Sequence, residues 1–435
     1  MTLVNVFIQD TIVAIATYLA PSSVAIIRLS GADAVSLAKS ICLHQHHWIS
    51  HKAIYTYVQD EQQQLIDEVL VLPMLAPHSY TRQHVVEIHC HGSVVIAKTI
   101  LQLLLNKGAR LAQPGEFTLR AFMNGRLSLT QAESVLDLIH APSLSMAKKA
   151  LANLKGSLST QLHHIRSQLI HLLAQMEVQL DFEYEESIDI HAPLLQLLDQ
   201  IDQLLNTPSQ WYRYGIRVAL IGVPNVGKST LFNALAEEER SIVTSIAGTT
   251  TDVIEISIQW KQACFRLFDT AGLKSASSEI ETKAIAKTQQ MANHCDLILW
   301  VTDVHQPLQI PNHLKQPIII VLNKIDLVEQ IQPPQTSLPV VMVSALQGSN
   351  LTHLKNMIYE HTMKQQPDGI YINERQTQLL QQAKQQLIML QQAMQKGYPL
   401  EILSWHLKNA IRALEENDVN QSTLHAIFSQ FCIGK

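Results

Sequence analysis

The sequence lacks an excess of basic side chains. Its 32 Lys and Arg are outnumbered by 37 Asp and Glu, which gives a formal net charge of −5. This balance argues against a broad basic face for nucleic acid. Any contact with RNA is therefore expected to be local or to be made through a partner. The candidate side chains, which could equally be solvated helix faces, are Arg120, Arg126, Lys148, Lys149 and Lys155.

Paired cysteines and long apolar runs are also missing. The five cysteines form no C-x-x-C pair, and their odd number suits free thiols in a reducing compartment. The first basic residue is Arg28, so the basic start of a secretory signal is absent. No apolar run approaches the length that spans a bilayer. We therefore expect a cytoplasmic enzyme without a membrane segment.

The hydrophobic pattern changes three times along the chain. Residues 1–118 mix short apolar strands with helices, which is typical of an α+β domain. Residues 119–210 have helical spacing and almost no glycine, strands alternate with helices over 211–370, and helical spacing resumes over 371–435. The sequence predicts a multidomain protein of mixed α/β and α+β class, with a Ras-like α/β domain inserted into a helical domain. The two helical segments must pack together, because neither buries its apolar stripe alone.

A phosphate-binding loop opens the predicted α/β domain. The motif Gly222-x4-Gly227-Lys228-Ser229 lies between an apolar run and a helical pattern, the strand, loop and helix order that it requires. Backbone N–H groups of such a loop surround phosphates, and glycine is needed because side chains would block that approach. The Lys228 ammonium would reach the outer phosphates, and the Ser229 hydroxyl would be a ligand for Mg²⁺.

Three further motifs follow strand-like runs in the order of a GTPase. Asp269 begins Asp-Thr-Ala-Gly, where a carboxylate can hold the metal through water and a glycine N–H can contact the terminal phosphate. Asp326, in Asn-Lys-Ile-Asp, can accept two hydrogen bonds from guanine, and adenine lacks that donor pair. Ser-Ala-Leu at 344–346 would place a backbone N–H against the base carbonyl, so the motifs together predict GTP rather than ATP.

The predicted GTP-binding residues come from the four motifs and from the segment that follows the first of them. They are Asn225, Val226, Gly227, Lys228, Ser229, Thr230, Thr244, Ser245, Ile246, Ala247, Gly248, Thr249, Thr250, Asp269, Thr270, Ala271, Gly272, Asn323, Lys324, Asp326, Ser344, Ala345 and Leu346.

The sequence has no obvious group to orient the attacking water. Leu273 stands where Ras-like enzymes carry glutamine, and an apolar side chain cannot orient water. Glu281 is a candidate for that role, and an exposed carboxylate at a helix start is the competing interpretation. The Asn225 amide and carbonyl groups within Thr244–Thr250 could hold a monovalent cation in place of an arginine finger, which spacing alone does not prove.

Three segments carry a resemblance to a known family. They are Ile242–Thr250, the Pro-Gly-Glu-Phe region within Gln113–Arg126, and the terminal Cys-Ile-Gly-Lys of Cys432–Lys435. Together with the order of the GTP motifs, they resemble the MnmE (TrmE) tRNA-modification GTPase family over nearly the whole chain. The second and third segments are specific to that family, whereas the GTP motifs are shared with other bacterial GTPases.

The resemblance implies a function and a set of partners. Members of the family act as homodimers with an FAD-containing partner, MnmG, which implies a heterotetramer. Together they modify carbon 5 of the wobble uridine (position 34) of certain tRNAs to an aminomethyl or carboxymethylaminomethyl group. By motif match, Ser229 and Thr250 correspond to the Mg²⁺ ligands and Glu281 to the catalytic glutamate. The potassium ligands implied by the same match are Asn225, Thr244, Ile246 and Thr249.

The resemblance also assigns residues 1–118 to dimerisation and to a tetrahydrofolate derivative. Arg28, Glu87, Arg126 and Lys435 fall on its folate-contacting positions, and Cys432 lies where a reactive thiol is conceivable, although a lone cysteine is usually a small buried hydrophobe. The sequence departs from the family at two places nearby. Ala20–Ala25 replaces a glycine-rich stretch, and Thr81–His84 replaces Thr-Gly-Glu-Asp.

Two alternatives stay open at this point. An Era- or Der-like ribosome-assembly GTPase would share the GTP motifs but would lack the terminal Cys-Ile-Gly-Lys and the N-terminal domain. A module that docks tRNA or a partner and has lost its folate chemistry is favoured by the altered Ala20–Ala25 stretch.

Overall fold

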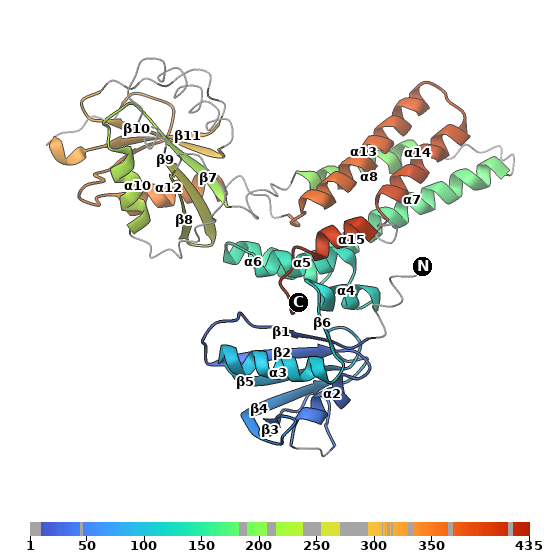
Figure 1. The fold of residues 1–435 in the computed structure, drawn as a ribbon. Coiled ribbons are helices and arrows are strands. Elements are labelled where there is room, and N and C mark those ends of the chain that lie inside the picture. The colour runs from blue at the N-terminus through green and yellow to red at the C-terminus, as the bar shows by residue number, and fades with distance from the viewer. Residues whose placement is uncertain are drawn as a thin grey trace, which may run out of the picture. The chain divides into compact units, whose positions relative to one another are not determined.

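In the computed structural model the chain divides into two units by its internal contacts. Figure 1 labels the helices and strands of both. One comprises 1–136, 154–162 and 414–435, and the other comprises 137–153 and 163–413. The description covers residues 10–43, 47–181, 189–206, 215–237, 254–269, 295–306, 308, 310, 314, 316–328, 334–363, 369–415 and 421–435.

A mixed sheet forms the centre of the first unit. Its strand order is β3-β4-β5-β2-β1-β6, and every neighbouring pair is antiparallel except β1 with β6. The strands are β1 (Ile12–Ile15), β2 (Val24–Ser30), β3 (Ile54–Gln59), β4 (Leu65–Met74), β5 (Val85–His91) and β6 (Arg110–Leu111).

Helices α2 (Ala34–Ile41) and α3 (Val94–Asn106) complete the core of this sheet. Alternate residues of the strands, such as Ile27 and Ile88, are fully buried and pack in one cluster with Ile100 of α3. This alternation follows from the period of two in a strand, because one face of an antiparallel sheet is covered and the other is not. The α+β character predicted for the N-terminal region is confirmed.

The C-terminal tail belongs to the same unit. Helix α15 (Gln421–Phe428) packs beside α4 (Glu116–Met123), and Phe428 and Phe431 share an apolar cluster with the start of α5 (Leu129–Ile139). The backbone N–H of Phe117 donates to the carbonyl of Lys435 at 3.2 Å. The end of the chain is therefore fixed against a segment more than 300 residues earlier in the sequence.

The second unit contains a group of helices. They are α6 (Leu144–Leu154), the greater part of α7 (Ser157–Asp181), α8 (His191–Leu205), α13 (Glu374–Gln395) and α14 (Leu400–Ala413). Asn373 begins α13 with a capping box, in which its side chain accepts from the Gln376 N–H and the Gln376 side chain accepts from the Asn373 N–H. Ion pairs from Lys384 to Asp202 and from Lys408 to Glu177 join helices that precede the α/β region in the sequence to helices that follow it. The domain boundaries given above remain a prediction.

A parallel sheet forms the α/β part of the second unit. Its strand order is β12-β11-β10-β7-β9-β8, with β8 antiparallel to β9 and every other pair parallel. The elements are β7 (Ile216–Ile221), α10 (Lys228–Glu237), β8 (Ile254–Trp260), β9 (Ala263–Asp269), β10 (Leu297–Asp303), β11 (Ile318–Asn323), the 3-10 helix η2 (Ile325–Leu327), β12 (Val340–Met342) and α12 (Leu351–Met363).

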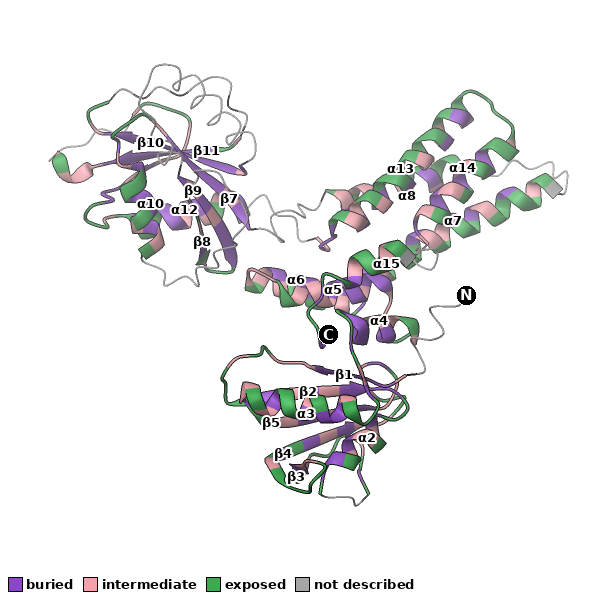
Figure 2. Cartoon of the chain, viewed as in Figure 1, coloured by how far each residue is buried: buried purple, intermediate pink, exposed green. Residues whose placement is uncertain are grey.

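Burial explains the composition of these strands. All residues of β10 and β11 are buried (Figure 2), as expected for central parallel strands covered on both faces. The chain passes from β7 to one side of the sheet and later returns to its other side with β10. The carboxyl ends of strands at such a reversal form the usual ligand site of an open α/β sheet.

Gly115 offers a test of how the tail is held. Its φ is +68°, and a Cβ there would lie 2.5 Å from the Phe428 carbonyl oxygen. Gly115→Ala should therefore displace α15 and destabilise its docking by about 1–3 kcal/mol. The measurement is native-state hydrogen exchange of the α15 amides. Gly108→Ala is the control, because Gly108 has φ +107° but nothing within 4 Å of the added carbon. Equal protection of α15 in both variants would contradict the prediction.

Candidate functional site

The phosphate-binding loop occupies the carboxyl end of β7. A Cβ on Gly222 would lie 2.0 Å from the Val301 carbonyl oxygen of β10, so only glycine fits there. Gly227 has φ +90°, and its Cβ would lie 2.5 Å from the Asn323 side-chain nitrogen. Asn225 adopts the left-handed conformation with φ +65°. The two motif glycines are therefore required by close neighbours as well as by the phosphate approach.

Lys228 is the first residue of α10 and lies inside the loop. Only 8% of Lys228 is exposed, and its ammonium donates to the carbonyls of Gly222 and Val223 at 2.9 Å each. Burial lowers the pKa of this ammonium, and the negative charge of Asp269 opposes that effect. A cation is thus held among loop carbonyls at the start of a helix, where the helix dipole also favours an anion.

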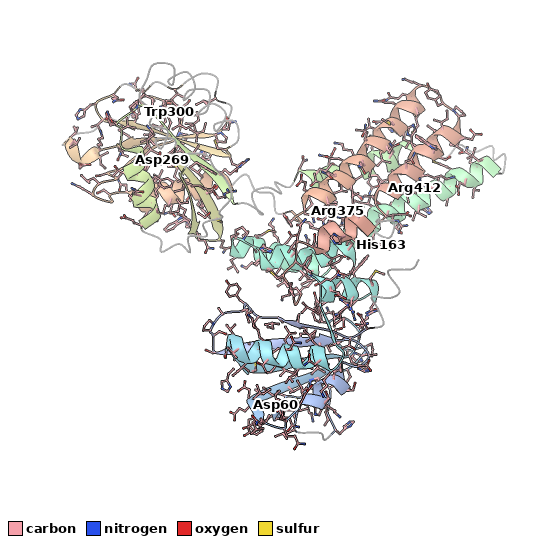
Figure 3. All side chains as sticks on the ribbon, viewed as in Figure 1. Asp60, His163, Asp269, Trp300, Arg375 and Arg412 are labelled. Atoms are coloured by element: carbon pink, nitrogen blue, oxygen red, sulfur yellow. The ribbon has the colours of Figure 1, made fainter. Side chains whose placement is uncertain are left out.

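Four of the predicted metal-binding and phosphate-binding residues belong to the described part of the chain and follow or end the strands β7 and β9. Asp269 (labelled in Figure 3) is the last residue of β9 and is 2% exposed. Asn225, Ser229 and Thr230 are exposed in or just after the loop. A hydroxyl oxygen and a carboxylate are ligands that suit Mg²⁺, so Ser229 and the nearby carboxylate fit a hard cation.

The guanine motifs are tied to the phosphate loop through Asn323. Its side-chain nitrogen donates to the Val226 carbonyl at 2.9 Å, and its side-chain oxygen accepts from the Ala345 N–H at 3.0 Å. Asp326 accepts a hydrogen bond from the Ser344 hydroxyl at 2.5 Å. Three of the four predicted motifs therefore form one hydrogen-bonded group, and Leu346 is exposed beside them.

Lys324 makes a second connection to the loop. Its ammonium donates to the Asn225 carbonyl at 2.7 Å and to the carboxylate of Asp303 at 3.1 Å. Asp303 was not predicted from the sequence. Its place just after the apolar run 297–301, on a strand next to the one that carries Asn323, was the signal that could have found it.

Several predicted residues lie outside the part of the chain that the structure describes. They are Thr244, Ser245, Ile246, Ala247, Gly248, Thr249, Thr250, Thr270, Ala271, Gly272 and Glu281.

A second group of predicted residues meets in the first unit. Arg28 on β2 donates to Glu87 of the neighbouring strand β5 at 2.8 Å and to the carbonyl of Gly434 at 2.8 Å. The Arg28 guanidinium also lies over the Phe117 ring at 5.8 Å, and Phe117 bonds the carbonyl of Lys435 through its N–H. Three of the four residues implied for folate binding are thus linked directly or through one neighbour.

Arg126 lies against Tyr80, which packs on the apolar cluster that contains Phe117. Its guanidinium lies 4.7 Å from the centre of the Tyr80 ring, and the Tyr80 hydroxyl bonds the Thr118 hydroxyl at 2.9 Å. Burial raises the pKa of Tyr80, and the positive charges of Arg126 and Arg28 oppose the rise. Tyr80 was not predicted from the sequence, because a single tyrosine carries no pattern, although its place directly before the altered segment Thr81–His84 was a signal that could have found it.

The two segments that depart from the family have partners within the unit. The Ser22 N–H donates to the Gly92 carbonyl, and a Cβ on Gly92 would lie 2.1 Å from the Ser22 carbonyl oxygen. Arg82 donates to the Asn124 carbonyl, and Gln83 accepts from Arg120 at 3.2 Å. Both altered segments are therefore built into the local packing.

Arg120 is not available for RNA. It is 2% exposed and forms ion pairs with Asp10 and Glu116, so including it among the surface RNA contacts was wrong. Its sequence context resembles an amphipathic helix surface, but the neighbouring carboxylates draw the guanidinium inward. Lys149 is likewise engaged, because its ammonium donates to the Gly369 carbonyl at 2.8 Å.

The cysteines divide into two kinds. Four are buried free thiols, and burial raises the pKa of Cys42 to about 12 and of Cys90 and Cys295 to about 11. Such thiols are unreactive at neutral pH because the thiolate is the nucleophile. Cys432 is exposed in the C-terminal tail, so the interpretation of it as a buried hydrophobe is wrong.

Comparison with known proteins decides the family. Residues 11–126 match the family described as GTP-binding protein TrmE N-terminus, and residues 129–432 match the MnmE helical domain. A protein of Cyanidioschyzon merolae named "Probable tRNA modification GTPase MnmE" is 68% identical over 100% of both chains. The chain belongs to the MnmE family. A Nostoc sp. tRNA modification GTPase MnmE is 40% identical over 98% of this chain and 100% of its own.

Solved structures of GTP-binding proteins match part of the chain, at low TM-scores. The G domain of the T. maritima FeoB iron transporter is 29% identical, with 34% of this chain and 98% of that chain covered and a TM-score of 0.27. The predicted resemblance to MnmE and the predicted fold class are confirmed by the family matches and by the two sheets. Within the described residues, no helix has the length and apolar character needed to cross a membrane.

Gly227 provides a test of the site geometry in this MnmE chain. Gly227→Ala would push the Asn323 amide from the Val226 carbonyl and is expected to weaken binding of GDP at least about tenfold. Titration with a fluorescent GDP analogue measures the effect. Gly348→Ala is the control, because Gly348 also has positive φ, at +73°, but nothing lies within 4 Å of the added carbon. Unchanged affinity in Gly227→Ala would contradict the close contact between Gly227 and Asn323.

Proposed function

We propose that this chain binds and hydrolyses GTP in a tRNA-modifying reaction. The observation that supports it most directly is the position of Asn323, which bonds the phosphate loop and the Ser344–Leu346 loop with one side chain. Such an arrangement fixes the distance between a phosphate site and a base site. The relatives' name, tRNA modification GTPase, and the family matches support the same assignment.

Guanine is the base that these groups would select. The Asp326 carboxylate is oriented by the Ser344 hydroxyl and can accept from both N1–H and the exocyclic amine of guanine. Adenine would leave that carboxylate without donors, and the loss of paired hydrogen bonds in a built site discriminates strongly.

The proposed cations and the catalytic acid come from the family resemblance. Ser229 and Thr250 would hold Mg²⁺, and Asn225, Thr244, Ile246 and Thr249 would hold K⁺. Positive charge at these positions stabilises the phosphoryl oxygens as charge shifts during transfer. Glu281 would orient the attacking water, because Leu273 offers no polar group. The exposed Asn225 and Ser229 side chains support this arrangement on the loop side.

The wider reaction is also proposed from the resemblance. The chain would act in the cytoplasm as a homodimer with the FAD-containing MnmG partner and would modify carbon 5 of the wobble uridine of certain tRNAs. The N-terminal unit would bind a tetrahydrofolate derivative through Arg28, Glu87, Arg126 and Lys435. A folate carries acidic groups that suit arginine and lysine, and its pterin offers N–H donors that suit a carboxylate.

The first test is GTP hydrolysis in K⁺ against Na⁺ buffer. The wild-type protein should be at least about tenfold faster in K⁺, because the cation stabilises charge in the transition state. Asn225→Ala should lose that stimulation, and Glu281→Ala should slow hydrolysis by about 100-fold. Gln392→Ala serves as the control, because Gln392 is an exposed residue of α13. Equal rates in both salts with an active Glu281→Ala would overturn the proposed mechanism.

The second test is calorimetric titration of the chain with tetrahydrofolate. Arg126→Ala should weaken binding about tenfold, because one charged contact is lost from an exposed position. Lys107→Ala, an exposed cation at the end of α3, should leave the affinity unchanged. No binding by the wild-type protein would contradict the folate assignment and favour a docking module without folate chemistry.

A further inference from the structure

The two carbonyls that face the guanine motifs lie in successive peptide units of the phosphate loop. Lys324 holds the Asn225 carbonyl at 2.7 Å, and Asn323 holds the Val226 carbonyl at 2.9 Å. In a trans peptide the carbonyl and the following N–H point in opposite directions. Both contacts therefore turn the N–H groups of Val226 and Gly227 away from the guanine motifs, and N–H groups left free in this way can receive the oxygens of a phosphate.

Lys324 needs a second contact to keep this position. Its backbone is left-handed, with φ +63° and ψ +36°, and its side chain is 33% exposed. A lysine ammonium so close to water is strongly hydrated and has several rotamers available. A single hydrogen bond to the Asn225 carbonyl restrains the Lys324 side chain only weakly. A carboxylate beside the ammonium therefore determines what fraction of the time the ammonium stays on the loop.

Asp303 supplies that anion. It is the last residue of β10, its side chain is 7% exposed, and its Oδ2 accepts from the Lys324 ammonium at 3.1 Å. Its Oδ1 accepts from the His305 N–H at 3.0 Å, which fixes the plane of the carboxylate. The His305 N–H and the Lys324 ammonium offset the free-energy cost of burying the negative charge of Asp303.

We propose that Asp303 is a positioning residue of the nucleotide site. Its carboxylate holds the Lys324 ammonium on the Asn225 carbonyl and thereby orients the loop N–H groups that receive the phosphates. The inference rests on the proposed function, since it assigns a role in binding guanine nucleotide. Asp303 is assigned no contact with phosphate or base and acts through Lys324.

The chain offers a matched control for this residue. Asp296 immediately precedes β10, at the opposite end of the strand, and its side chain is 9% exposed. It also forms an ion pair with a basic side chain, Arg217, at 3.0 Å. Asp296→Asn and Asp303→Asn therefore remove the same charge from similarly buried side chains at opposite ends of β10, and only Asp303 lies beside the proposed nucleotide site.

The experiment measures dissociation of a fluorescent GDP analogue from the full chain by stopped flow. Asp303→Asn should raise the dissociation rate about tenfold, and Asp296→Asn should change it less than about twofold, even where both lower the melting temperature equally. Equal rates in the two variants would overturn the role of Asp303 alone. Failure of the wild-type chain to bind guanine nucleotide would overturn the proposed function as well.

A double variant separates positioning from general stabilisation. Because Asp303 acts through Lys324, Asp303→Asn combined with Lys324→Gln should release GDP no faster than Lys324→Gln alone. If the double variant released GDP faster by the product of the two single-variant factors, the substitutions would act independently and the proposal would be contradicted. If Asp303→Asn does not fold, Lys324→Gln must still raise the dissociation rate about tenfold, and a wild-type rate would contradict the link.

Discussion

The side-chain amide of Asn323 connects parts of the α/β region that the backbone alone would leave independent. The phosphate loop follows β7, the guanine motif follows β11, and the Ser-Ala-Leu loop follows β12, so these segments come from three different strands. One donor and one acceptor on a single buried side chain join all three. A buried amide that is satisfied at both ends is rigid, because breaking either bond leaves a polar atom unpaired.

The glycines of the loop are explained by the same constraint. Gly227 lies so close to the Asn323 amide that any side chain would displace it, and Gly222 lies against the backbone of β10. The motif is therefore set by two requirements, the approach of a phosphate and the approach of the neighbouring strands. Two positive charges lie at the same loop, because the ammonium groups of Lys228 and Lys324 both donate to its backbone carbonyls.

In the first unit, too, hydrogen bonds join segments that lie far apart in the sequence. The last residues of the chain return to β2 and α4, where Arg28 bonds the Gly434 carbonyl and Phe117 bonds the Lys435 carbonyl. The sequence identified the tail and Arg28 as members of one site only through a resemblance. Contacts between residues 406 positions apart have no local pattern, so composition and periodicity could not predict them.

The parts that the sequence predicted well are those with local patterns. The phosphate loop and the strand ends were placed correctly because apolar runs of the right length precede each motif. Asp303 was not predicted because its partner, Lys324, follows the neighbouring strand rather than its own. Arg120 was wrongly predicted to be at the surface, because its burial depends on ion pairs with Asp10 and Glu116. Segments such as Thr244–Thr250 and the surroundings of Glu281 lie outside the described residues, so their assignments rest on the motif match.

The most direct test of the account is a change of nucleotide specificity at Asp326. Asp326→Asn exchanges one carboxylate oxygen for an amide donor and keeps the shape of the side chain. Titration of the variant with fluorescent GDP and XDP analogues should show loss of most affinity for GDP and a gain for XDP, because xanthine has a carbonyl where guanine has an amine. Unchanged affinity for GDP in this variant would contradict the placement of the guanine base at Asp326 and, with it, the assignment of the site.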